Sequence, residues 1–77
     1  MKRARITPGQ VEHLAANLKV FRIARGLPQE LLARECALSV AYISLLERRK
    51  RVASLDTVER IARALAVDPR LLLAPPR

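Results

Sequence analysis

With 77 residues, the chain is long enough for one domain with a modest hydrophobic core, and we expect a single domain over residues 1–77. Hydrophobic residues make up 51% of the sequence, which excludes a disordered chain, and no apolar run is long enough to span a membrane. Lysine and arginine number 15 against 7 acidic residues, so the net charge of +8 favours a polyanionic partner, unless the charge serves solubility alone.

The first predicted helix has clear signals at both of its ends. Residues 1–6 form a basic arm, after which Thr7 suits the N-cap, Pro8 the first helical position and Gln10 a capping box. Gly26 ends the helix, because glycine adopts the left-handed terminating conformation without steric cost. Between these ends, apolar residues recur at the spacing of one helix face, namely Val11, Leu14, Leu18 and Phe21.

Two short helices follow, over about residues 28–36 and 40–48. A very short connection separates them, and Ser39 is a good N-cap for the second helix. This arrangement matches the helix-turn-helix motif, which we expect over about residues 28–48. The motif requires a small residue where the helices touch, an apolar residue in the turn and apolar anchors beneath the second helix; these places are taken by Ala33, Leu38, Ile43 and Leu46.

Two more helices complete the predicted all-α fold. Ser54 caps a helix over about residues 55–66, and Asp68 with Pro69 starts a last short turn, before a tail over residues 74–77. The inner face of the longer helix is expected to comprise Leu55, Val58, Ile61, Ala62 and Leu65. Three consecutive leucines in the last turn cannot all face one small core, so we expect a dimer interface formed by Leu71, Leu72 and Leu73.

The second helix of the motif would carry the contacts to DNA bases, because this helix enters the major groove. With Ile43 and Leu46 turned inward, helical spacing and the N-terminal end of the helix predict a reading face of Ser39, Val40, Ala41, Ser44, Leu45 and Arg48. Leu45 either contacts a thymine methyl group or packs in the core or at a dimer face. Tyr42 either hydrogen-bonds a phosphate or covers the edge of the core.

A run of four basic residues follows this helix: Arg48, Arg49, Lys50 and Arg51. A charge run is often only a solvated face, but at the end of a reading helix it suits phosphate clamps or guanine contacts. The arm residues Lys2, Arg3 and Arg5 either enter a minor groove or form a flexible basic tail.

The sequence argues against an enzyme and against a resident cofactor. One histidine and one cysteine give no nucleophile–base pair and no metal cluster, and the sequence contains no phosphate-binding loop motif. We therefore expect no catalytic residue, metal, cofactor or small-molecule ligand. We interpret His13 as solvated and Cys36 as a small core residue. A lone cysteine forms no internal disulfide, which fits the cytoplasmic location that we expect.

The segment GLPQELLARECALSVAYISLLERRKR, residues 26–51, resembles the phage repressor and Cro family of helix-turn-helix regulators. LKVFRIARG before it and SLDTVERIARALAVDPRLLL after it also resemble that family, and short restriction–modification controller proteins are especially similar. The resemblance implies a five-helix, lambda-repressor-like domain. It also implies that Gln29 hydrogen-bonds a DNA phosphate, and that Arg22 and Glu47 form an ion pair between the first helix and the reading helix.

The reading face departs from the phage repressors, which carry glutamines where Val40, Ala41 and Leu45 stand here. We therefore expect direct readout through methyl contacts, a serine and an arginine, with much of the specificity coming from DNA shape. Ala37 and Arg49 stand where relatives carry glycine. A left-handed alanine costs about 1 kcal/mol, and we expect the loop after the reading helix to differ in path.

These features together predict a sequence-specific transcriptional regulator that binds double-stranded DNA as a homodimer, at a near-palindromic operator with half-sites about 34 Å apart. A restriction–modification controller protein fits this description. The alternative is an antitoxin-like protein-interaction module that also binds its own promoter, because the same fold serves both roles. No interaction with a membrane is expected, because the arginines are spread among helices with separate apolar stripes.

Overall fold

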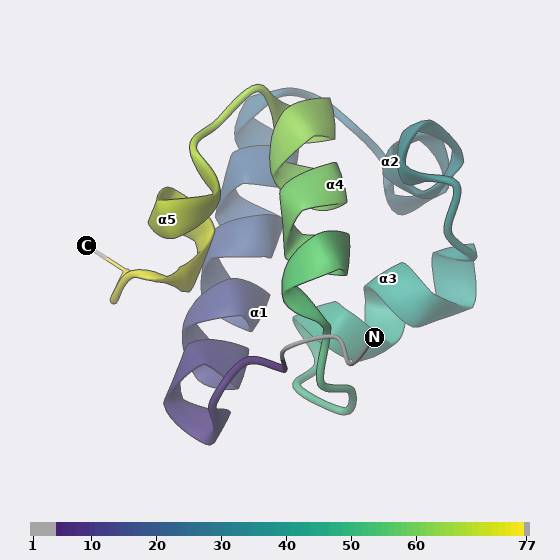
Figure 1. The fold of residues 1–77 in the computed structure, drawn as a ribbon. Coiled ribbons are helices and arrows are strands. Elements are labelled where there is room, and N and C mark those ends of the chain that lie inside the picture. The colour runs from purple at the N-terminus through teal and green to yellow at the C-terminus, as the bar shows by residue number, and fades with distance from the viewer. Residues whose placement is uncertain (1–4, 77) are drawn as a thin grey trace.

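The computed structural model describes residues 5–76, and this part of the chain contains five helices, as predicted (Figure 1). They are α1 (Pro8–Ala24), α2 (Gln29–Cys36), α3 (Val40–Glu47), α4 (Leu55–Leu65) and α5 (Pro69–Leu73). In Figure 1, α1 and α4 stand between α5 on one side and the α2–α3 pair on the other. Helix α5 packs on α1 and α4, while α3 packs on α1 and α2. The predicted all-α class is confirmed.

Four of the five helices within residues 5–76 begin at a side-chain cap, where the sequence predicts their start, whereas α2 follows Pro28 without one. The Thr7 hydroxyl accepts from the Gln10 backbone N–H at 3.2 Å, and the Gln10 side chain accepts from the Thr7 N–H at 2.9 Å. Three further caps follow one pattern: the side chains of Ser39, Ser54 and Asp68 accept from the backbone N–H groups of Tyr42, Thr57 and Arg70. Each cap satisfies a helix donor that would otherwise lack a partner, and contributes about 1 kcal/mol.

Within residues 5–76, four helices are followed, one or two positions after their last residue, by a residue with positive φ, and only one of these residues is glycine. Gly26 has φ 68°, Ala37 57°, Arg49 61° and Ala66 57°. At each end, the next N–H donates to the carbonyl five residues earlier, as in the bond of 2.8 Å from Lys50 N to the Leu45 oxygen. The left-handed conformation expected of Ala37 is therefore present. Arg49 adopts the left-handed conformation that glycine adopts without strain, and the expected difference in loop path stays a prediction.

The core collects large apolar side chains from all five helices. Those under 2% exposed are Leu14, Leu18, Leu32, Ile43, Leu46, Val58, Ile61, Leu65 and Leu72. The inner face predicted for α4 is correct except for Leu55, which is 40% exposed. Leu55 is the first residue of α4, and the buried position one turn before Ile61 belongs to Val58, with Thr57 buried beside it.

Helix α5 is held by polar side chains of α1. The Asn17 Nδ2 lies 3.0, 2.9 and 2.7 Å from the carbonyl oxygens of Leu71, Leu72 and Ala74, so its two hydrogens are shared among the last carbonyls of α5. The His13 Nδ1 lies 3.1 Å from the carbonyl oxygen of the residue between them, Leu73. Asn17 is only 7% exposed. A helix leaves its last carbonyls without internal partners, and these contacts supply them.

This anchoring corrects the predicted dimer surface. Leu72 is fully buried in the core and Leu73 is half-buried, so of the three leucines only Leu71, at 48% exposure, is exposed to solvent. Helix α5 is a single turn of five residues, and one turn points its residues in different directions. The prediction that Leu72 lies at the surface is wrong.

No helix within residues 5–76 is long and apolar enough to cross a membrane. In that same part of the chain, no group of three or more histidine, cysteine or acidic side chains is placed to hold a metal ion.

Candidate nucleic-acid interface

Helices α2 and α3 form the helix-turn-helix. Ala33, 3% exposed, lies where the two helices meet, and its carbonyl accepts from the Leu38 N–H at 2.9 Å across the turn. Ile43 and Leu46 are buried beneath α3, and Leu38 packs half-buried against the core. These four residues pack the inner face of α3 against the rest of the domain. The outer face of α3 is left free for a partner.

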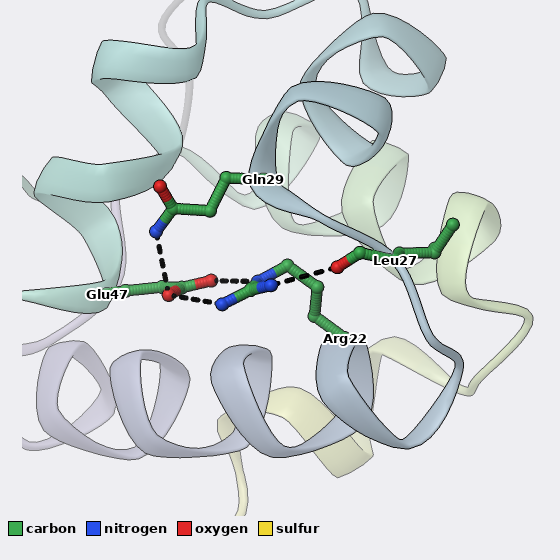
Figure 2. A network of polar contacts seen from close by, with 4 residues as sticks. All are labelled: Arg22, Leu27, Gln29 and Glu47. Carbon is green, nitrogen blue, oxygen red and sulfur yellow. Dashed lines mark hydrogen bonds and ion pairs between the residues drawn. The ribbon is translucent and has the colours of Figure 1, made fainter.

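A polar network fixes the far end of α3 to the rest of the domain (Figure 2). The Arg22 guanidinium donates from Nε to Glu47 Oε2 at 2.6 Å and from Nη2 to Glu47 Oε1 at 3.1 Å. Its Nη1 donates to the Leu27 carbonyl at 2.8 Å, and the Gln29 Nε2 donates to Glu47 Oε1 at 3.0 Å. The structure thus brings together the two residues that the family resemblance paired.

The network is largely removed from solvent. The side chains of Arg22 and Glu47 are 12% and 5% exposed. Hydrogen bonding to Glu47 raises the pKa of Arg22, against the opposing effect of burial, so this arginine stays charged. A two-pronged guanidinium–carboxylate contact permits one relative orientation of its partners. The pair therefore restricts the orientation of α3 relative to α1.

Gln29 belongs to the same network, which refines its predicted role. It is the first residue of α2, where backbone N–H groups have no partner inside the helix. One hydrogen of its side-chain amide is taken by Glu47, and the other has no acceptor within residues 5–76. An anion at this end of α2 would meet that hydrogen and the positive end of the helix dipole together.

The predicted reading face is presented outward to different degrees. Ser39, Val40, Ala41 and Arg48 are exposed, and Ser44 and Leu45 are half-buried. Leu45 is not part of the hydrophobic core, although two buried residues flank it at positions 43 and 46. Tyr42 packs against the core, so the alternative of a core-edge role is present in the structure. The outer face of α3 therefore carries mostly apolar and hydroxyl side chains, and an arginine directly follows the helix.

The basic run continues from that end. Arg48, Arg49, Lys50 and Arg51 are all exposed, and Arg49 lies 3.8 Å from the Glu12 carboxylate. Both of those side chains are more than 60% exposed, so the contact is a weak surface pair. The run leaves a strongly positive surface at the end of α3.

The single cysteine belongs to α2 and the single histidine to α1, so neither lies on the reading helix. Cys36 is 2% exposed, and burial raises the pKa of its thiol. Its backbone carbonyl accepts from Arg60 Nη1 at 2.9 Å, which ties the end of α2 to α4. Both facts describe a packed core residue. His13 contacts α5 and is half-buried rather than fully solvated as expected.

Sequence reasoning did not single out Asn17, because an asparagine inside an amphipathic helix usually indicates a solvated position. Its place on the inner side of α1, between Leu14 and Leu18, was the available signal. The arm residue Arg5 lies beside α4's first turn, while Lys2 and Arg3 lie outside the described residues.

Comparison with known proteins gives the family. Residues 18–72 match the helix-turn-helix family HTH_3, and the chain belongs to this family of DNA-binding regulators. It is 42% identical to a hypothetical transcription factor of Neisseria meningitidis over 64 residues, which are 83% of this chain and 60% of that protein. It is 51% identical to control protein C.BamHI of Bacillus amyloliquefaciens over 57 residues, which are 73% of this chain and 70% of that one.

Solved structures agree with this relationship. The crystal structure of the hypothetical transcription factor NHTF from Neisseria matches with a TM-score of 0.84 at 35% identity, over 99% of this chain and 88% of that one. The restriction–modification controller protein C.Esp1396I, solved as a tetramer with its natural 35 base-pair operator, matches with a TM-score of 0.75 at 28% identity. That match covers 82% of this chain and 83% of the controller protein.

Proposed function

We propose that this protein is a non-enzymatic, cytoplasmic transcriptional regulator that binds a near-palindromic operator as a homodimer, as a restriction–modification controller protein. One observation carries the proposal: the network of Arg22, Glu47 and Gln29 locks α3 in one orientation while its outer face stays open. A helix held in one orientation presents its outer face to a partner as a preformed surface. The exposed cations that follow α3 supply the attraction to DNA.

In this proposal α3 lies in the major groove. Ser44 and Arg48 contact base edges, while Val40, Ala41 and Leu45 meet thymine methyl groups. Gln29 and the start of α2 bind a phosphate at one edge of the groove. Few of these side chains distinguish bases by paired hydrogen bonds, so DNA shape and bendability contribute much of the specificity.

Dimerisation would use the side of the domain opposite to α2. Leu71 of α5 is 48% exposed, and α1, which packs on α5, exposes Val20 by 61% and Ile23 by 59%. Val20 and Ile23 are three residues apart, so they are neighbours on one helix face. Val20 also follows Asn17, the anchor of α5, by one helical turn. Exposed apolar side chains on neighbouring helices favour burial against a second copy.

The test is selection from a pool of random duplex DNA, followed by titration of the selected duplex and of unselected duplex. We expect a sequence with two-fold symmetry that binds at least ~10³-fold more tightly than bulk DNA. Arg48→Ala should lower the preference for that sequence. Arg63→Ala, which removes an exposed arginine from α4, is the matched control. Equal affinity for all sequences would contradict the proposal and leave the antitoxin-like interaction module as the better description.

A further inference from the structure

The last two residues of the N-terminal arm, Arg5 and Ile6, are attached to the loop that follows α3. Ile6 is 5% exposed and belongs to the hydrophobic core, and its N–H donates to the Ala53 carbonyl at 3.4 Å. Arg5 and Ser54 form an antiparallel β-bridge. The buried Ile6 side chain therefore anchors the arm in the core. Arg5, next to it, is held at the surface beside the loop rather than free in solution.

The arm, α1 and the loop after α3 together line a surface depression of about 370 Å³. Its lining residues are Arg5, Val11, Arg49, Lys50, Arg51 and Val52. Four of these residues are cations, brought together from two segments more than forty positions apart. A second depression of about 410 Å³ adjoins it and shares Val11, Arg49 and Val52, with Glu12 as its one carboxylate. Glu12 lies 3.8 Å from Arg49, and within residues 5–76 the other three cations have no ion-pair partner.

We propose that this depression binds a sugar–phosphate segment of the DNA backbone, with Arg5 as a phosphate contact outside the helix-turn-helix. This inference rests on the proposed DNA-binding function and extends its footprint. Unpaired cations held close together repel one another, and an anion between them removes that repulsion. Guanidinium groups suit phosphate because they donate two parallel hydrogen bonds.

The apolar part of the depression distinguishes a DNA backbone from a free phosphate ion. Val52 is 42% exposed and Val11 is half-buried, so they offer an apolar floor between the cations. A deoxyribose ring presents apolar carbon and hydrogen atoms between two phosphates, and it complements that floor, whereas inorganic phosphate does not. The loop that lines the depression directly follows the reading helix, and the Lys50 N–H donates to the Leu45 carbonyl of α3 at 2.8 Å.

The test measures how affinity for DNA depends on salt, with the whole chain as wild type, Arg5→Ala, Arg5→Lys and the control Arg63→Ala. Each protein is titrated against the selected duplex and against a short duplex of random sequence. Loss of one phosphate contact lowers the magnitude of the log–log salt slope by about 0.9. It therefore weakens binding by roughly eightfold at about 0.1 M salt. We expect this change for Arg5→Ala on both duplexes, and wild-type slopes for Arg5→Lys and Arg63→Ala.

The outcomes separate this inference from the proposed function. If wild type prefers no sequence but Arg5→Ala still lowers the slope on random DNA, the proposed function fails and the backbone site stands. If wild type binds the selected duplex and Arg5→Ala matches Arg63→Ala, the site is refuted and the function stands. A loss limited to the selected duplex, with an unchanged slope, would show a base contact and overturn the backbone site. If inorganic phosphate occupied the depression as tightly as the DNA backbone and displaced it, the preference for a sugar–phosphate segment would likewise be overturned.

Discussion

Removing the Glu47 carboxylate should destabilise the domain severely. Glu47→Ala leaves the Arg22 guanidinium, whose side chain is 12% exposed, without its anion, and it removes an acceptor from Gln29. Breaking a buried pair from one side costs 3–5 kcal/mol, and the slight exposure here places the expected loss at about 3 kcal/mol. A domain of 77 residues has roughly 4–12 kcal/mol of stability in total. The variant therefore loses a large fraction of its stability.

The assay is urea unfolding monitored by circular dichroism, with melting temperature as a second readout. A loss of about 3 kcal/mol corresponds to a fall of roughly 12–24 °C in a domain of this size. The double variant Arg22→Ala with Glu47→Ala should be less destabilised than the sum of the single variants, because it leaves no buried charge. Arg70→Ala, which removes an exposed pair with Asp68, is the control and should change the unfolding free energy little. A Glu47→Ala effect as small as that control, or strict additivity in the cycle, would refute the reasoning.

Three further predictions follow from the same structure. Asn17→Ala should lower the unfolding free energy by about 1–3 kcal/mol in urea titration, because the last carbonyls of α5 lose their donor; an unchanged midpoint would contradict that role. Ala66→Gly should stabilise the protein by roughly 0.5–1 kcal/mol, since a left-handed alanine becomes a glycine, whereas Ala16→Gly inside α1 should destabilise it by a similar amount; the same sign for both would sink the argument. Leu71→Asp should give a folded monomer in analytical ultracentrifugation, whereas Leu72→Asp should unfold the chain, and a dimeric Leu71→Asp protein would place the interface elsewhere.

Helix boundaries could be predicted well because they depend on local chemistry. Thr7 with Gln10, Ser39 and Ser54 each cap a helix through a hydrogen bond within three residues along the chain. Such contacts require no knowledge of the tertiary structure. The buried face of α4 was predictable for the same reason, except at Leu55, where the first turn extends past the core.

The candidate site was only partly accessible from the sequence. The spacing of the two short helices predicted the motif, and family resemblance paired Arg22 with Glu47 across 25 positions. No local rule links such distant residues, so without the resemblance the pair would have read as two surface charges. The attachment of Gln29 to the same carboxylate likewise depends on how α2 packs against α3.

The amino-acid sequence by itself therefore determined the helices, their caps, most of the inward faces and the basic character of the proposed DNA-binding surface, because each depends on neighbours within a few positions. Only the tertiary structure decided which of three consecutive leucines is buried, because the Asn17 amide sets how α5 lies on α1. It also decided that Arg5 lies beside the basic loop, because Ile6 packs in a core that is built largely from residues much later in the chain. Local hydrogen bonds are encoded next to the groups they serve, whereas burial depends on every element that shares the core.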